Sequence, residues 1–407
     1  MIKDLVAVVL AGGEGRRLNP LTQDRAKPAV PFAGQYRIID FSLSNCLNSH
    51  IRKIIVLTQY KSGSASRHLA AGWSIFNPEL GEFIYEIPPQ MRVGEKWYQG
   101  TADAIYQNLY SLEIIKPKYL LILAGDHVYK MDYGRMLDFH KASHAALTIS
   151  AITVTRKEAS GFGVIETDAD QRVIGFQEKP RNPKTIPGHP DRAYASMGVY
   201  IFDFELLREL LIKDAANPES SHDFGNDIIP SLYPQAPVYA YPFGRDKKIR
   251  DAAYWRDVGT IDAFWEANID LAGVDPHFNL YDNDWPIRTY QAQAPPAKFV
   301  FANEKEKRVG RALDSLVCNG VIISGGLAVN SVLSPGVRIN SFARVEKSIL
   351  MHRVEIGRHC RIRKTIIDKG VFVPPGTEIG YDPEKDRERF PVSEGGVVVV
   401  PKGTVFR

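Results

Sequence analysis

The amino-acid sequence predicts an α/β domain with an open, mainly parallel sheet, followed by a parallel β-helix. Three observations lead to this prediction. Residues 5–11 form an aliphatic run without alternation, which is typical of a strand buried on both faces. Up to about residue 275, similar short apolar runs alternate with longer helical patterns, as they do in parallel sheets. In the last quarter of the chain, a motif recurs every 16 or 17 residues.

The predicted sheet takes further strands from residues 53–58, 119–124, 147–154 and 197–202. Residues 102–115 are predicted to form one helix, because Ala102, Ile105, Leu109 and Leu112 lie close to helical spacing. Thr101 directly precedes this helix and is a plausible N-cap.

The repeated motif starts at Ser315, Ser331, Ser348 and Thr365. Each copy opens with a hydroxyl residue and two apolar residues, and then gives Val-x-aliphatic. Short strands, turn residues and a fixed period are what the coils of a β-helix require. An antiparallel sandwich is the alternative, but it would not demand a fixed period.

The chain exceeds one hydrophobic core, so we expect more than one domain. Four prolines between residues 276 and 296 predict an extended crossing. We therefore divide the chain into a catalytic domain (1–275), an interdomain linker (276–300) and a β-helix domain for regulation and oligomerisation (301–407).

Composition narrows the class of protein. With 44% hydrophobic and 24% charged residues, the chain is an ordinary soluble protein. Its net charge of +4 gives no basic stripe for nucleic acid, and no apolar run has the length of a membrane helix. Cys46, Cys318 and Cys360 show no C-x-x-C spacing, which favours a reducing compartment. The first strand begins at once and leaves no room for a signal peptide, so we expect a cytoplasmic protein without nucleic-acid or membrane partners.

The loop after the first strand reads Gly-Gly-Glu-Gly-Arg-Arg (residues 12–17) and is followed by Lys27-Pro28. Glycines let backbone N–H groups approach a ligand, and the cations add positive charge, which together suit phosphate. The dinucleotide fingerprint G-x-G-x-x-G fails at Leu18, and the P-loop motif is missing from this loop. A plain surface turn would explain the glycines but not the cations.

This loop and five later segments resemble the sugar-nucleotide pyrophosphorylases, and among them the bacterial glucose-1-phosphate adenylyltransferases. The segments are RAKPAV (25–30), RIIDF (37–41), WYQGTAD (97–103), LAGDH (123–127) and YWRDVGT (254–260). The resemblance covers nearly all 407 residues in the same order. It implies a Rossmann-like nucleotidyltransferase domain, a left-handed parallel β-helix, and Mg²⁺ as cofactor. The implied reaction transfers AMP from ATP to α-D-glucose 1-phosphate and gives ADP-glucose and pyrophosphate, the committed step of bacterial glycogen synthesis.

In that reaction a glucose 1-phosphate oxygen attacks the α-phosphorus of ATP in line, so the protein must neutralise charge and hold geometry. The resemblance assigns Arg17 and Lys27 to the triphosphate, together with the loop amides of Gly12, Gly13 and Gly15. Arg16 stands at a variable position and is equally well a solvated surface arginine.

Two aspartates match the metal-binding positions of the family. Asp126 directly follows a buried strand, where a carboxylate suits Mg²⁺ that bridges phosphates, although Gly-Asp is also good turn chemistry. Asp257 is the second predicted metal ligand, and the alternative is an N-cap of a helix over residues 261–272. The predicted catalytic set is thus Arg17, Lys27 and Asp126.

The resemblance places the nucleotide and the sugar phosphate on different segments. Residues matched to the nucleotide are Gln90, Gly100, Thr101 and Ala102. Residues matched to glucose 1-phosphate are Tyr98, Gly163, Glu178, Lys179 and Ser196, of which Glu178 and Lys179 end a predicted strand. An exposed Glu-Lys pair at a turn is the alternative for these two. His222 and Asp223 are expected near the sugar, unless they only form a hydrogen-bonded turn.

Members of the family are commonly homotetramers that bind small-molecule effectors between the domains. The resemblance offers Arg25, Arg37 and Arg389 for such an anion site. Enteric members bind their activator with a lysine where this chain has Gln35, which cannot supply that charge. We therefore expect another effector than fructose 1,6-bisphosphate, such as a sugar monophosphate.

Three other functions compete with this interpretation. The nearest is a nucleotidyltransferase for another base or sugar. A β-helix acyltransferase would use His352 or His359, which both stand among arginines. A silent regulatory subunit would have lost charged site residues, yet Arg17, Lys27, Asp126, Lys179 and Asp257 are all present.

Overall fold

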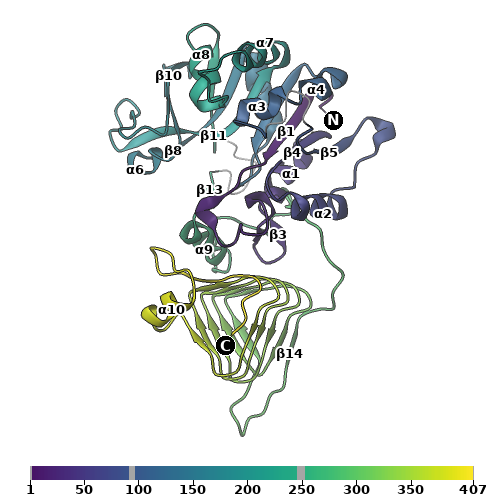
Figure 1. Cartoon of the computed structure of the whole chain (residues 1–407), viewed down its shortest axis with the longest axis vertical. Helices are drawn as coiled ribbons and strands as arrows, with labels where there is room; N and C mark the ends of the chain where they lie inside the picture. Colours follow the sequence, from purple (N-terminus) through teal and green to yellow (C-terminus); the bar gives the residue numbers. More distant parts are fainter. Residues whose placement is uncertain (1, 91–96, 245–252, 407) are drawn as a thin grey trace.

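The computed structural model describes residues 2–90, 97–244 and 253–406. It shows an α/β domain that contains the N-terminus and a β-helix that contains the C-terminus, stacked along the long axis of the molecule (Figure 1). This arrangement confirms the predicted architecture, an α/β domain followed by a parallel β-helix.

The α/β domain is built on a nine-stranded mixed sheet, in which one path of strands has the order β10-β9-β11-β6-β1-β4-β5. Strands β6, β1, β4 and β5 are parallel to one another, and β12 is parallel to β8. The long strand β11 runs antiparallel to β6, β8 and β9. The strands are β1 (Leu5–Ala11), β4 (Lys53–Thr58), β5 (Phe83–Ile87), β6 (Tyr119–Ala124), β8 (Leu147–Thr155), β9 (Gly163–Thr167), β10 (Val173–Glu178), β11 (Arg192–Asp203) and β12 (Val238–Pro242).

Helices cover both faces of this sheet. Val6 and Val8 of β1 belong to one hydrophobic cluster, whereas Ala7 and Val9 belong to a second, so the strand is buried on both sides as its sequence predicts. The first cluster receives side chains from α3, α4 and α7, and the second from α1, α2 and α5. These helices are α1 (Ile39–Asn48), α2 (Gly63–Gly72), α3 (Thr101–Tyr106), α4 (Leu109–Ile115), α5 (Tyr133–Ala142) and α7 (Phe204–Ala215).

The structure corrects the prediction of one helix over residues 102–115. The chain forms α3 and α4 instead, with a break at residues 107–108. The predicted cap at Thr101 is also wrong, because Gly100 holds the N-cap position. The Thr101 hydroxyl donates to Asp223 Oδ2 at 2.8 Å. Its side chain therefore bonds to a carboxylate that is distant in the sequence and does not cap its own helix.

Shorter elements complete the α/β domain. A two-stranded pair of β7 and β13 lies beside the main sheet, and β2 and β3 form a small hairpin. These elements are β2 (Pro31–Phe32), β3 (Tyr36–Arg37), β7 (His127–Tyr129), β13 (Trp255–Asp257), α6 (Arg156–Ala159), α8 (Ile229–Leu232) and α9 (Ile261–Asp270).

The β-helix consists of three parallel five-stranded sheets, which confirms the prediction from the repeat. The first sheet contains β14 (Lys298–Val300), β17 (Ile322–Ser324), β20 (Arg338–Ile339), β23 (Glu355–Ile356) and β26 (Phe372–Val373). The second contains β15 (Arg311–Leu313), β18 (Leu327–Val329), β21 (Arg344–Glu346), β24 (Arg361–Arg363) and β27 (Glu378–Ile379). The third contains β16 (Leu316–Val317), β19 (Val332–Leu333), β22 (Ile349–Leu350), β25 (Thr365–Ile367) and β28 (Val398–Val400), and α10 (Pro383–Arg389) lies between β27 and β28 in the sequence.

A ladder of hydroxyl groups explains why each repeat opens with Ser or Thr. The Ser348 hydroxyl accepts from the Thr365 backbone N–H at 3.2 Å and donates to the Glu346 carbonyl at 2.6 Å. The same pattern joins Ser315 to Ser331 and Ser331 to Ser348. Because the residue before each hydroxyl has a positive φ, the side chain satisfies backbone groups at a tight corner.

The third sheet of the β-helix packs against the α/β domain. Val332, Ile349 and Ile366 share a hydrophobic cluster with Phe32 and Phe264 of that domain. Beside this cluster, Arg25 Nη2 lies 2.6 Å from Asp368 Oδ2, and both side chains are almost fully buried. The two parts of the chain are therefore joined by apolar packing and by a buried ion pair.

The segment between the two parts is extended and is held against the α/β domain by polar contacts. The buried ammonium of Lys130 donates to the Asn279 carbonyl at 2.9 Å and to Asp282 Oδ2 at 2.8 Å. The Thr289 hydroxyl donates to Asp40 Oδ2 at 2.6 Å. In the described residues, no helix has the length and apolar character needed to cross a membrane, and all three cysteines are free.

We expect Ser348→Ala to lower the free energy of unfolding by about 1–3 kcal/mol, because it leaves the buried Thr365 N–H without its acceptor. Urea unfolding followed by circular dichroism measures the change. Ser160→Ala is the matched control, since the Ser160 hydroxyl is exposed and bonds only within its own turn. Equal stability of the two variants would contradict a supporting role for the ladder.

Candidate active site

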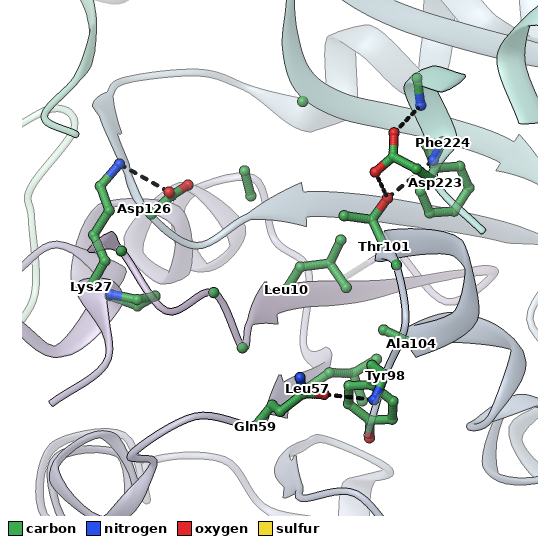
Figure 2. A pocket seen from close by; sticks show the side chains of 18 of the residues that line it. Leu10, Lys27, Leu57, Gln59, Tyr98, Thr101, Ala104, Asp126, Asp223 and Phe224 are labelled. Atoms are coloured by element: carbon green, nitrogen blue, oxygen red, sulfur yellow. Dashed lines mark hydrogen bonds and ion pairs between the residues drawn. The ribbon is translucent and has the colours of Figure 1, made fainter. Parts of the chain in front are cut away.

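A cavity of about 470 Å³ opens where β1, β4 and β6 end, at the edge of the sheet where open α/β folds bind ligands. It is lined by the glycine loop after β1, by residues at the ends of β6 and β10, and by residues within β11. Figure 2 shows Lys27 and Asp126 on one side of it and Thr101, Asp223 and Phe224 on the other. The predicted site residues that line it are Gly12, Gly13, Gly15, Lys27, Tyr98, Gly100, Thr101, Asp126, Glu178 and Lys179. The predicted residues Arg17, Gln90, Ala102, Gly163, Ser196 and Asp257 are not part of its lining.

The glycine loop is packed tightly against Lys27. Gly15 has a φ of +66°, and a Cβ there would lie 2.9 Å from the Lys27 Cβ. Only glycine meets both conditions without strain. Arg17 follows in a short 3-10 turn, and its side chain is largely exposed. The three loop glycines and Lys27 thus line the cavity together, with the lysine stem packed against Gly15.

The Lys27 ammonium lies between two carboxylates from distant segments. Lys27 Nζ is 2.9 Å from Asp126 Oδ2 and 2.6 Å from Asp257 Oδ1. The lysine side chain is only 6% exposed, so both contacts are shielded from water on its side. Arg17 Nη2 adds a longer contact of 3.6 Å to Asp257 Oδ2.

This arrangement keeps Lys27 and Asp126 charged at neutral pH. Burial by itself lowers the pKa of Lys27, but Asp126 and Asp257 outweigh it and raise that pKa above its ordinary value. Burial raises the pKa of Asp126, but the Lys27 ammonium and His127 hold it well below its ordinary value. The lysine thus loses its stabilising contribution only above about pH 10.5, and Asp126 only below about pH 4.

Asp126, His127 and Asp257 also form a group that could hold a metal ion. One ligand atom from each lies within 4.8 Å of the others. The pairing of β13 with β7 places Asp257 directly opposite His127 and so fixes the spacing. The alternative role of Asp257 as a helix cap is wrong, because Thr260 is the N-cap of α9 and accepts from the Ala263 N–H at 3.2 Å.

Gly100 allows the predicted nucleotide segment to touch another loop. A Cβ at Gly100 would overlap the His222 carbonyl, and the Ala102 N–H donates to that carbonyl at 2.9 Å. Thr101 accepts from the Phe224 N–H at 3.0 Å. Ala102 is buried behind this contact, and exposed Gln90 directly precedes residues 91–96, which the structure does not describe.

Among the predicted sugar residues, Glu178 and Lys179 lie at the end of β10, whereas Tyr98 contacts Gln59 and Asn108. Glu178 lies opposite Gly163 of β9, and a Cβ at Gly163 would lie 2.5 Å from the Phe176 ring. Lys179 Nζ is 2.6 Å from Glu178 Oε1 and is otherwise exposed. Ser196 is buried behind the wall, with its hydroxyl 3.3 Å from the Tyr200 hydroxyl.

Sequence reasoning missed several residues of the cavity wall. Gln59 follows β4, lines the cavity and accepts from the Tyr98 N–H at 2.9 Å. Its position just beyond a predicted parallel strand was the sequence signal that could have identified it as a wall residue. Tyr200 and Phe224 also line the cavity. Asp223 lines it as expected, but His222 does not pair with Asp223, since its Nδ1 lies 2.8 Å from Asp214 Oδ2.

A group of basic side chains lies at the junction with the β-helix. Burial and the proximity of Arg37 and Arg25 lower the pKa of Lys369 to about 7. Burial and Lys369 lower the pKa of His352 to about 4. Arg25 Nη1 is buried and has no hydrogen-bond partner among the described residues. We call Arg25, Arg37, His352 and Lys369 the junction cluster.

Two predicted effector residues lie outside this cluster. Gln35 lies in the turn between β2 and β3, next to Tyr36. The Arg389 guanidinium lies over the rings of Phe390 and Phe406, at 4.8 and 5.7 Å from their centroids. His359, considered for acyl transfer, stacks on the Phe342 ring at 4.9 Å.

Comparisons with known proteins match both parts of the chain. The nucleotidyl transferase family model matches residues 6–273, and the model of a GlmU-like, C-terminal hexapeptide region matches residues 295–400. A glucose-1-phosphate adenylyltransferase of Rhodopirellula baltica is 55% identical, over 100% of this chain and 92% of that protein. The chain belongs to the glucose-1-phosphate adenylyltransferase family.

Other members of this family are almost as similar. Glucose-1-phosphate adenylyltransferase 2 of Vibrio cholerae is 53% identical over 100% of this chain and 99% of that protein. The enzyme of that name from Methylococcus capsulatus is 54% identical over 98% of this chain and 94% of that protein. The resemblance seen in the sequence motifs is thereby confirmed along the whole chain.

We expect Gly100→Ala to lower the free energy of unfolding by about 1–3 kcal/mol, because the added methyl must push the Thr101 and His222 segments apart. Chemical denaturation measures the change. Gly13→Ala serves as the control, since a Cβ at Gly13 has no neighbour within 4 Å. A Gly100→Ala protein as stable as the control would show that the close approach is not required.

Proposed function

We propose that this protein transfers the adenylyl group of ATP to α-D-glucose 1-phosphate and releases pyrophosphate, the committed step of bacterial glycogen synthesis. The observation that carries this proposal is the Lys27 ammonium held by Asp126 and Asp257 beside a glycine loop, with Lys27, Asp126 and the loop glycines lining one cavity. The names of the relatives support the choice of ATP and glucose 1-phosphate. In our proposal, the catalytic domain spans residues 1–275, the linker 276–300 and the β-helix domain 301–407.

The cavity offers a separate place for each reactant. We assign the nucleotide to the wall of Gly100 and Thr101, and the sugar phosphate to Tyr98, Glu178 and Lys179. The two regions are joined by the glycine loop, where Gly12, Gly13 and Gly15 present N–H groups to the triphosphate. Gln90, Ala102, Gly163 and Ser196 are assigned to the edges of these two regions, as the family resemblance implies.

Charge neutralisation is the main task of the protein in this reaction. Both reactants are anions, and the phosphate oxygen of the sugar must approach the α-phosphorus in line with the leaving pyrophosphate. Arg17 and Lys27 offset the charge of the triphosphate, and Lys179 that of the sugar phosphate. Glu178 accepts hydrogen bonds from sugar hydroxyls. Fixed cations at these places stabilise the charge that develops on the leaving group.

Asp126 and Asp257 fit a bound Mg²⁺, because carboxylate oxygens are the ligands that this hard cation prefers. A Mg²⁺ held by these two carboxylates would offset phosphate charge and make the attacked phosphorus more electrophilic. The carboxylates themselves orient the loop cations, since each is in contact with Lys27.

We further propose that the junction cluster binds an anionic effector. Its basic side chains lie close enough to lower the pKa values of Lys369 and His352, and binding of an anion relieves the repulsion between the charged ones. The sequence predicted Arg25 and Arg37 for this site. Arg389 lies outside the junction cluster, and we propose it only as a peripheral residue of the effector site. Because Gln35 carries no charge, we propose a sugar monophosphate as activator. The assembly is proposed to be a cytoplasmic homotetramer.

Replacing Asp126 with asparagine removes the negative charge of the carboxylate and keeps the shape of the side chain. We expect kcat to fall at least about a hundredfold, because stabilisation of the phosphates is lost in the transition state. Pyrophosphate release from ATP and glucose 1-phosphate measures the rate, and calorimetry checks that ATP still binds. Asp170→Asn, at an exposed turn, is the control. A folded Asp126→Asn enzyme with full turnover would overturn the metal assignment.

The junction cluster predicts a pH-dependent affinity for anions. Because the pKa of Lys369 is about 7, the lysine is mostly neutral at pH 8 and must take up a proton when an anion binds. Sulfate affinity should fall above pH 7, by up to about tenfold per pH unit. Calorimetry in buffers of different ionisation enthalpy measures both affinity and proton uptake.

Lys369→Met should remove that pH dependence, whereas the exposed Lys307→Met should keep it. The other charged or titratable groups near Lys369 are Arg25, Arg37, His352, Asp368 and Lys402. The pKa of Lys369, at about 7, lies within the pH range of this experiment. The same pH profile in Lys369→Met and the wild type would contradict anion binding at Lys369.

A further inference from the structure

The phosphate-binding role of Lys27 does not account for the contacts that its ammonium makes. Lys27 Nζ bonds to the two carboxylates of the metal-binding group, at 2.9 and 2.6 Å. Figure 2 shows its side chain rising from the loop toward Asp126. The lysine therefore lies against the same oxygens that a divalent cation would use.

Each of the four carboxylate oxygens already faces a nitrogen. Lys27 contacts Asp126 Oδ2 and Asp257 Oδ1. The remaining oxygens face His127 Nε2 at 3.5 Å and Arg17 Nη2 at 3.6 Å. A divalent cation that enters between the aspartates must therefore displace Lys27 from at least one of them.

Charge balance makes this displacement unfavourable for a metal ion alone. Lys27 and Arg17 together neutralise the formal charges of Asp126 and Asp257. A divalent cation added by itself would leave the displaced ammonium in a partly desolvated site with excess positive charge. A triphosphate that enters with the metal supplies the missing negative charge.

The fold allows Lys27 to turn from the carboxylates to a phosphate without a change in the backbone. Its stem lies against Gly15, and the cavity is lined by Lys27 together with the glycines of the loop. A lysine side chain carries its compact ammonium on a flexible four-carbon stem, so rotation about the bonds of the stem can redirect the ammonium.

We propose that Lys27 acts as an exchangeable cation, which bridges Asp126 and Asp257 until metal and nucleotide arrive together. The ammonium then leaves the carboxylates for the triphosphate, and the metal takes its place. This inference rests on the proposed metal site, and it adds an order of binding: the divalent ion binds weakly to the free enzyme and tightly only with the nucleotide.

Binding of Mn²⁺ to the full-length protein without nucleotide tests the proposal, with free Mn²⁺ measured by electron paramagnetic resonance. We expect Lys27→Met to bind Mn²⁺ at least about tenfold more tightly than the wild type, because the competing cation is gone. Lys27→Gln, which keeps N–H donors, should show a smaller gain and serves if Lys27→Met fails to fold. Arg16→Met removes a charge from the same loop, at a side chain that is 84% exposed, and should leave the affinity nearly unchanged.

The outcomes separate the two hypotheses. If the gain in Lys27→Met disappears when Asp126→Asn is added, the tighter Mn²⁺ lies at the aspartates and the exchange is supported. If Mn²⁺ binds equally to the wild type, Lys27→Met and Lys27→Gln, and is lost in Asp126→Asn, the metal site stands but the exchange is overturned. If Asp126→Asn changes Mn²⁺ binding in no background, with or without a non-hydrolysable ATP analogue, the proposed metal site itself fails.

Discussion

The contact between Lys27 and two carboxylates is the constraint on which the rest of the site depends. An ammonium that is 6% exposed is tolerated only when it is paired, because an unpaired buried charge is destabilising by several kcal/mol. Its partners are 99 and 230 positions away in the sequence. The end of β6, the pair of β7 and β13, and the turn that carries Lys27 must therefore meet at one point. The glycine loop is held beside this point, because Gly15 packs on the lysine stem.

Helix α1 supports both the active site and the junction with the β-helix. Its buried Asp40 accepts hydrogen bonds from His68, Trp73 and Thr289, and from the backbone N–H of Arg37. Two residues further along, the Ser42 hydroxyl donates to the carbonyl of Ala124, which lines the cavity just before Asp126. The same helix thus fixes the position of a junction cation and of a cavity wall. The segment between the two domains is tied to it through Thr289.

Local patterns in the sequence were sufficient for β1, β4, β6, β8 and the second half of β11, for the coils and for the glycine loop, but they did not predict β5, β9 or β12. The aliphatic run of β1 and the spacing of Ser315, Ser331 and Ser348 reflect burial and corner geometry that each segment carries by itself. Contacts across long sequence distances could not be read in this way. Thr101 looks like a helix cap until Asp223 is placed beside it, and Gln59 becomes part of the wall only when β4 lies next to β1.

The junction cluster also depends on contacts between residues that are far apart in the sequence. Lys369 follows an aspartate at an ordinary turn of the repeat, and nothing in its neighbours indicates a lowered pKa. That property arises because the coil brings it close to Arg25 and Arg37, more than three hundred residues earlier in the chain. Family resemblance supplied roles for Arg17, Asp126 and Asp257, whereas the geometry shows which groups touch them.

The buried pair of Arg25 and Asp368 also restricts how the β-helix can change in evolution. Every coil repeats the same hydroxyl ladder, so a coil could be inserted or deleted without breaking the pattern of the helix itself. One such event before residue 368 would move Asp368 along the axis by one strand spacing, about 4.8 Å, and leave Arg25 facing the wrong coil. The number of coils between the crossing segment and Asp368 is therefore constrained by this ion pair together with the apolar packing of the third sheet, although the repeat alone would permit any length.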